Sequence, residues 1–195
     1  MKYNINDRGL ITKRRKRLKM KPLIALVVLC VLFLGISITT YAYYTSGYIW
    51  PSSTISYYYE SYNSLRGKTY FQIGANGWTG TDVNFVSGTA GNHNILCTET
   101  NQPKVGWDAI TAITVNGKYY TSNTIQINTA LTQTYNDDGA LRSVIIHEFG
   151  HCLGLGDSGD AVIMNGYTWG DGSRYGYYRI TTIQADDKNG ANALY

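Results

Sequence analysis

Three residues near position 150 have the types and the spacing to bind and use a metal ion. His147 and His151 stand four residues apart in an H-E-x-x-H pattern, whose acidic residue is Glu148. On a helix, residues four apart lie on one face with Cβ atoms roughly 5–6 Å apart, so both imidazoles can reach one ion. Glu148 can reach a metal-bound water as a general base without being a ligand itself. The pattern therefore predicts a hydrolytic zinc site on a helix.

The residues after this pattern decide its meaning, because the bare pentapeptide also occurs on amphipathic helices with two surface histidines. Gly154 stands where a helix would end, since glycine accepts the left-handed conformation there. The chain can then turn back and bring Asp157 to the same metal as a third ligand. No His or Glu follows His151. A downstream third ligand must therefore be one of five aspartates: Asp157, Asp160, Asp171, Asp186 or Asp187.

This stretch resembles the zinc motif of the metzincin proteases, with Asp157 where most metzincins carry a third His. The subgroup that the chain most resembles is the matrixins. A competing resemblance concerns Asp171, since residues 170–176 resemble the aspartate motif of the aspzincin proteases. There the spacing from Asp171 to Tyr175 is one residue too long.

The matrixin resemblance covers about residues 48–195 and implies a small α+β domain, with a twisted mixed sheet, an active-site helix and a C-terminal helix. Strands are predicted at residues 49–59 and 94–97. A type I′ hairpin is predicted around Asn116 and Gly117. The next strand alternates apolar and polar residues, and the resemblance places it at the sheet edge above the metal, where an extended peptide could pair with it. An ordinary interior strand is the alternative for these residues, which are Thr124, Ile125, Gln126, Ile127 and Asn128.

Several further residues take their expected roles from the resemblance or from helix capping. Met164 fits the methionine turn beneath the zinc of metzincins. Tyr167 could stabilise an oxyanion, as a tyrosine near that turn does in astacins, although the spacing differs by one residue. Asp137 or Asp138 is expected to cap the zinc helix. Asp186 and Asp187 lie in the first turn of the expected closing helix, where we interpret them as capping residues.

The N-terminal part of the chain predicts export. A basic run ends at Lys21, and residues 23–38 carry no charge, which indicates a signal peptide or an N-terminal transmembrane anchor. The chain has 17 basic and 13 acidic residues, and residues 1–42 contain nine of the basic residues and one of the acidic ones. Residues 43–195 therefore have a formal charge of −4. This acidic remainder argues against a nucleic-acid partner. Cys97 and Cys152 are an even pair in an oxidising setting, so a disulfide between them stays open.

Together these observations predict a secreted or membrane-anchored extracellular zinc endopeptidase that hydrolyses proteins or peptides as a monomer. One catalytic Zn²⁺ is expected. A second, structural zinc is excluded because only His93 would remain to bind it, and Ca²⁺ stays open because no loop spells a calcium motif. The expected membrane contact is the N-terminal segment alone. Two other classes are considered: an inactive zinc fold that binds peptides, and a cell-surface structural protein, suggested by 18 Tyr and 21 Gly.

Overall fold

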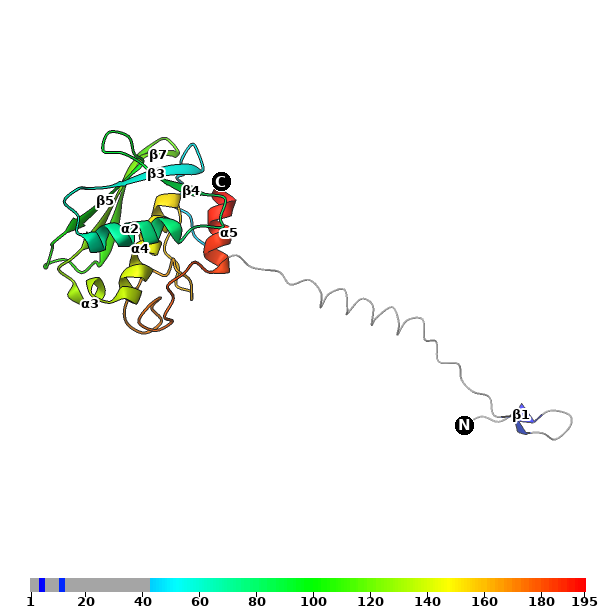
Figure 1. The fold of residues 1–195 in the computed structure, drawn as a ribbon. Coiled ribbons are helices and arrows are strands. Elements are labelled where there is room, and N and C mark those ends of the chain that lie inside the picture. The colour runs from blue at the N-terminus through cyan, green and yellow to red at the C-terminus, as the bar shows by residue number, and fades with distance from the viewer. Residues whose placement is uncertain (1–3, 6–10, 13–42) are drawn as a thin grey trace. The chain divides into compact units, whose positions relative to one another are not determined.

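The structure is a computed structural model that describes residues 4–5, 11–12 and 43–195 (Figure 1). The chain divides into two compact units, residues 1–40 and 41–195. The second unit contains the predicted metal motif, and the elements that position this motif are all described.

In the first unit, β1 (Asn4–Ile5) pairs antiparallel with β2 (Ile11–Thr12). The basic run of residues 13–21 and the apolar run of residues 23–38 lie outside the described residues. A signal peptide would be cleaved after a small residue such as Ala42, which also lies outside them. In the part of the chain that the structure describes, no helix is both long and apolar enough to cross a membrane.

A five-stranded mixed sheet forms one layer of the second unit (Figure 1). In spatial order its strands are β4 (Asn84–Ser87), β3 (Thr54–Tyr59), β5 (Ile95–Thr100), β7 (Tyr119–Asn128) and β6 (Ala109–Asn116). The first four run parallel, and β6 runs antiparallel to β7. Alternation along β3 buries Ile55 and Tyr57, because successive strand residues face opposite sides. The predicted α+β class with a mixed sheet is confirmed.

The strand predicted to be the substrate edge is an interior strand instead. The five residues lie in β7, which pairs with β5 on one side and β6 on the other; they are Thr124, Ile125, Gln126, Ile127 and Asn128. The prediction was wrong because the hairpin before them folds β6 back along the outer side of β7. The two loop residues of this hairpin are Gly117 and Lys118. The φ angle is positive at Gly117 (60°) and is not positive at Lys118. This combination fits a type II′ turn instead of the predicted type I′. The edge of the sheet at this end is β6.

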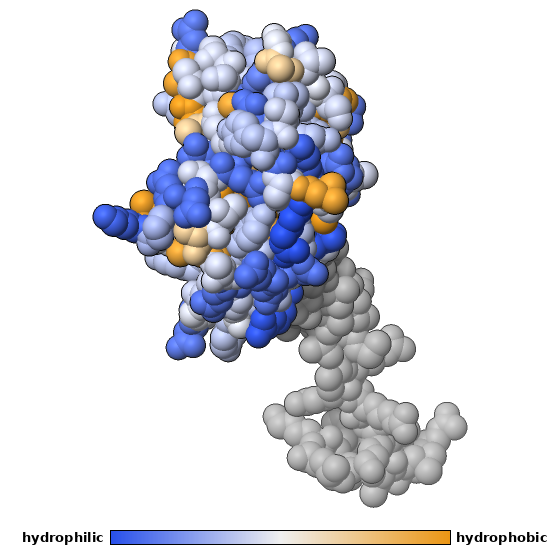
Figure 2. Space-filling model, turned by 60° about the vertical axis from the view of Figure 1, so that its left-hand side comes forward, coloured by the Kyte–Doolittle hydropathy of each residue, from blue (hydrophilic) through white to orange (hydrophobic). Residues whose placement is uncertain are grey.

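Helices complete the domain and enclose its core. In the second unit they are α2 (Leu65–Asn76), α3 (Thr132–Tyr135), α4 (Asp138–Leu153) and α5 (Ala185–Leu194). Trp78 and Phe149 are fully buried between α2, α4 and the sheet, and the Trp78 indole donates to Ile146 O at 2.9 Å. On the face seen in Figure 2, hydrophobic residues are scattered in small groups among hydrophilic ones. The apolar side chains of α4 are buried in the hydrophobic core.

The Tyr/Ser/Thr/Gly-rich composition of residues 43–53 predicts a tether, but the segment from Tyr44 to Trp50 is bound to the domain. Ser46 N donates to Gly154 O at 2.7 Å, and Gly156 N donates to Tyr44 O at 2.8 Å. Trp50 is buried, and its indole donates to Cys152 O at 2.8 Å. The composition of this segment misled the prediction, because its tyrosines and its tryptophan pack on the domain.

Cys97 on β5 and Cys152 on α4 are buried free thiols in this structure. Burial raises the pKa of both thiols. Among the described residues neither thiol belongs to the candidate metal group, and both pack in the hydrophobic core.

Candidate active site

Helix α4 begins after an N-cap residue. Asp137 is the N-cap, and its carboxylate accepts from Ala140 N at 2.9 Å and from the Tyr175 hydroxyl at 2.8 Å. The bond from Ala140 is the main reason that the pKa of Asp137 is lowered, and an anion at this helix end suits the helix dipole. Of the two predicted caps, the structure has Asp137. Nearly the whole helix is buried, so its polar residues stand out as functional candidates.

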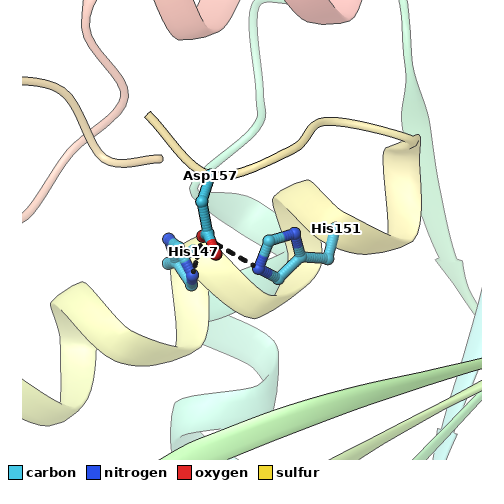
Figure 3. A group of neighbouring side chains, drawn as sticks. All are labelled: His147, His151 and Asp157. Carbon is cyan, nitrogen blue, oxygen red and sulfur yellow. Dashed lines mark ion pairs between the residues drawn. The ribbon is translucent and has the colours of Figure 1, made fainter. Parts of the chain in front are cut away.

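His147 and His151 project from one face of α4 with their Nε2 atoms toward Asp157 (Figure 3). His147 Nδ1 lies 3.0 Å from Ile163 O, and His151 Nδ1 lies 2.9 Å from Leu155 O. A carbonyl only accepts, so each Nδ1 carries the proton and donates it. Each Nε2 therefore presents a lone pair to the same point, the arrangement in which histidines bind metals.

A left-handed glycine ends the helix and returns the chain to the histidines. Gly154 has φ 104° and is the C-cap of α4. A Cβ at this position would collide with Tyr48 O, so both the conformation and the close approach require glycine. The turn carries Asp157 back over α4, as the spacing predicts (Figure 3).

Asp157 Oδ1 has the separation from each histidine Nε2 that a tetrahedral metal requires. Asp157 Oδ1 lies 3.3 Å from His147 Nε2 and 3.4 Å from His151 Nε2, and the three atoms all lie within 4.8 Å of one another. Zinc bonds of about 2.0–2.1 Å in tetrahedral geometry place neighbouring ligand atoms about 3.3–3.4 Å apart. The donor set therefore fits Zn²⁺. Among the described residues the group does not include the competing candidates Asp160, Asp171, Asp186 and Asp187.

The charges of this group suit a metal. Burial lowers the pKa of His147 far below its usual value, and the nearby Arg174 lowers it further. Burial is the largest influence on His151 and opposes its protonation, but the hydrogen bonds with Asp157 and Leu155 O and the charges of Glu148 and Asp157 together outweigh it, so the pKa of His151 is raised. A metal ion that binds His151 Nε2 would displace that proton. The hydrogen bond with His151 lowers the pKa of Asp157. A neutral imidazole and an ionised carboxylate are the forms that bind a cation.

Glu148 is buried beside the ligands and is held by a residue from the edge strand. Only 5% of Glu148 is exposed, and its Oε2 accepts a hydrogen bond from Thr111 Oγ1 of β6 at 2.7 Å. Burial raises the pKa of Glu148, while the charge of His151 and the Thr111 hydroxyl oppose that rise. A carboxylate with a raised pKa accepts a proton more readily, as a general base should.

Met164 lies in a turn that packs against α4. A Cβ at Gly150 would collide with Met164 Sδ, so α4 and the turn pack as closely as the missing side chain permits. Buried Asp187 of α5 accepts from Ile163 N at 2.9 Å and from Met164 N at 3.0 Å. Ile163 O in turn accepts from His147, so Asp187 supports the first ligand through the turn. The predicted capping role of Asp187 is present as well, since it accepts from Gln184 N at 2.7 Å.

A cavity of about 390 Å³ opens beside His147 and Glu148. Tyr167, which is 73% exposed, lines it, so the structure brings this predicted residue to the same site. Trp107 and Trp169 form further parts of the wall, and the buried Arg174 also lines the cavity. The arrangement offers a polar space next to the candidate base.

Sequence reasoning missed the roles of Thr111 and Arg174. Thr111 lies in a strand rich in β-branched residues, where a threonine carries no signal of its own. Only the fold brings its hydroxyl to Glu148. Arg174 lies in a glycine-rich stretch next to the competing ligand Asp171. A single Arg in a polar loop gives no signal, because burial of its side chain depends on the folded path.

The comparisons with known proteins agree with this geometry. The family model described as Matrixin (Peptidase_M10) matches residues 57–195, well over half of the chain. No curated protein matches the chain. The matched range contains the sheet, α4, the methionine turn and the closing helix.

Proposed function

The chain belongs to the matrixin family of metallopeptidases, and we propose that it acts as an extracellular zinc-dependent endopeptidase. The observation that carries this proposal is the buried Glu148 between His147 and His151 on α4, beside a cavity, with Asp157 Oδ1 at 3.3 Å and 3.4 Å from the two histidine Nε2 atoms. A site that only bound peptides would have no use for a buried carboxylate beside a metal.

His147, His151 and Asp157 would hold the zinc ion in this proposal. Zinc, when bound, supplies a Lewis acid that polarises the peptide carbonyl and makes a water more acidic. Glu148 accepts the proton of the attacking water at its carboxylate and later passes it to the leaving nitrogen. Thr111 holds the Glu148 carboxylate in place through its 2.7 Å hydrogen bond. Tyr167 is the proposed donor to the oxyanion that forms on the peptide carbonyl.

The substrate in this proposal lies along β6, not along β7 as the sequence suggested. Strand β6 is the last strand of its sheet, so one side has backbone N–H and C=O groups that an extended peptide can pair with. Thr111 belongs to the same strand and contacts Glu148. A peptide paired with β6 would therefore run past the general base.

The expected location rests on the N-terminal sequence and on the family. We propose that residues 1–42 direct export as a signal peptide or a membrane anchor, which places residues 43–195 outside the cell, with no nucleic-acid partner and as a monomer. Protease added to intact cells should then degrade the zinc domain, unless the domain is found in the medium. A domain protected inside intact cells would contradict this placement.

One experiment tests the enzymatic proposal. Purified protein should contain about one zinc per chain, cleave casein, and lose activity to a chelator and regain it with added zinc. The matched variant Glu148→Gln should keep the zinc and the fold but lower the rate by about 10²–10⁴, the usual contribution of a general base. A Glu148→Gln protein that cleaves as fast as the parent would show that Glu148 is not the base.

A further inference from the structure

Arg174 is a buried cation in the wall of the substrate cavity. Only 2% of the residue is exposed, and it lines the cavity beside His147 and Glu148. Burial lowers its pKa to about 10, which still leaves the guanidinium charged at neutral pH. A positive charge is therefore fixed within the space where we place the substrate.

The hydrogen bonds of Arg174 leave part of the guanidinium without a partner. Nη1 donates to Asn165 O at 2.6 Å, and Nη2 donates to Thr168 Oγ1 at 3.1 Å. Both acceptors are neutral. Among the described residues, Nε has no hydrogen-bond partner, and no carboxylate lies within ion-pair distance of Arg174.

The nearest carboxylates do not remove this deficit. Asp108 also lines the cavity, but its Oδ1 accepts from Thr134 Oγ1 at 2.5 Å. Glu148 is held by Thr111, and Asp157 faces the two histidines. Each of these anions favours the charged form of Arg174 from a distance, but none contacts it.

A buried charge without a counter-ion is unfavourable, and so is a buried N–H without an acceptor. A purely structural role in holding Asn165 and Thr168 explains two of the five guanidinium N–H groups and leaves the charge and Nε unexplained. A carboxylate from a ligand in the cavity would supply the missing anion, because a guanidinium binds carboxylates in a fork geometry.

We propose that Arg174 is a specificity-determining residue whose guanidinium binds a carboxylate of the substrate inside the cavity beside Glu148. This inference rests on the proposed peptidase function and narrows its substrate class. The carboxylate comes from a Glu or Asp side chain next to the cleaved bond, or from a free C-terminus close to it. The cavity volume of about 390 Å³ is ample for one such side chain.

The test compares peptides that differ only at one residue. Zinc-loaded protein is given peptides with Glu, Gln or Leu on either side of the cleaved bond, each with a free or an amidated C-terminus. We expect kcat/KM to be about tenfold or more higher for Glu than for Gln, because Gln has the same shape but no charge. Equal rates for Glu and Gln, with no effect of the free terminus, would overturn the inference. A preference for the free terminus alone would identify that carboxylate as the one bound.

Two variants connect the preference to Arg174. Arg174→Gln should bring the Glu and Gln peptides to within about twofold of each other, since the buried donor and its charge are gone. Lys104→Gln is the control, because it removes one exposed positive charge from the segment before β6 and should preserve the preference. A folded Arg174→Gln protein with an unchanged preference contradicts the proposal. If its melting curve shows that this variant does not fold, Arg174→Lys replaces it, and an unchanged preference in Arg174→Lys contradicts binding by the guanidinium fork.

A binding measurement separates this inference from the peptidase proposal. Trp107 and Trp169 line the cavity, so their fluorescence should report peptide binding to the Glu148→Gln protein, in which cleavage is suppressed. We expect the Glu peptide to bind about tenfold more tightly than the Gln peptide. If the unmodified protein cleaves no peptide at all, the proposed function fails, and the ratio of the two Kd values still decides on Arg174.

Discussion

Replacing Asp157 by alanine removes one of three proposed ligands while disturbing little else. The Asp157 side chain is 62% exposed, so the fold should survive its loss. Its Oδ1 lies 3.3 Å from His147 Nε2 and 3.4 Å from His151 Nε2, which makes it the only carboxylate among the described residues that faces both. After Asp157→Ala the site retains two histidines and no anion.

The expected loss of zinc affinity is large. Structural zinc sites with four ligands bind with apparent free energies of about 10–16 kcal/mol, or about 2.5–4 kcal/mol for each ligand. At about 1.4 kcal/mol for each factor of ten, the loss of Asp157 should raise the Kd for zinc roughly a hundredfold to a thousandfold. Activity at limiting zinc should fall by a similar factor.

The assay measures zinc bound after dialysis against a competing chelator, together with the melting temperature of the protein. Asp171→Ala is the matched control, because Asp171 was the main competing ligand and is exposed, outside the metal group. Its zinc affinity should equal that of the parent. Asp157→His should retain zinc, because histidine is the more common third ligand in metzincins.

The result that would refute this reasoning is a reversal of the two alanine variants. If Asp157→Ala keeps a full equivalent of zinc while Asp171→Ala loses it, then the ligand set is wrong. The tetrahedral spacing of the three atoms would then be coincidental, and the proposed mechanism would lose its metal.

Two further predictions follow from the residues that support the site. Thr111→Val should remove the hydroxyl that stabilises the ionised form of Glu148, which lowers kcat about tenfold, raises the pKa of Glu148 and moves the acidic limb of the pH–rate profile upward. Thr111→Ser should restore both values, and an unchanged profile in the valine variant would contradict the role of this hydroxyl. Asp187→Ala removes the acceptor of three backbone N–H groups, those of Ile163, Met164 and Gln184. The free energy of unfolding should fall by about 1–3 kcal/mol, so the melting temperature should fall by about 2–12 °C. The control Lys188→Ala lies exposed on the same helix and should shift the melting temperature far less, and equal shifts would disprove this account.

Local patterns in the sequence were sufficient for the centre of the site. The spacing of His147 and His151 follows from the helical period, which depends only on the segment itself. The helix end at Gly154 and the cap at Asp137 are equally local, and both are present in the structure. The spacing of Asp157 predicted the return of the chain to the histidines, because the turn is only three residues long.

The order of the strands could not be predicted in the same way. The alternation of residues 124–128 indicated a half-buried strand, and the matrixin resemblance placed that strand at the sheet edge, yet it lies between β5 and β6. Alternation reports which face of a strand is buried and does not report which strands lie on its two sides. The position of β6 depends on where the hairpin folds back, and this is decided by packing of the whole sheet.

The sequence by itself determined the metal motif, the helix that carries it and the α+β class, because each of these rests on short-range periodicity and on residue types. Only the tertiary structure decided which residues surround that motif. Thr111 reaches Glu148 from the edge strand, Asp187 supports the methionine turn from the last helix, and Arg174 is buried in the cavity wall. These contacts join residues far apart in the sequence: Asp187 lies 23 residues from Met164, and Thr111 lies 37 residues from Glu148. The sequence around Thr111, Asp187 and Arg174 carries no motif for these roles, so the roles depend on burial and hydrogen bonds that exist only after the chain has folded.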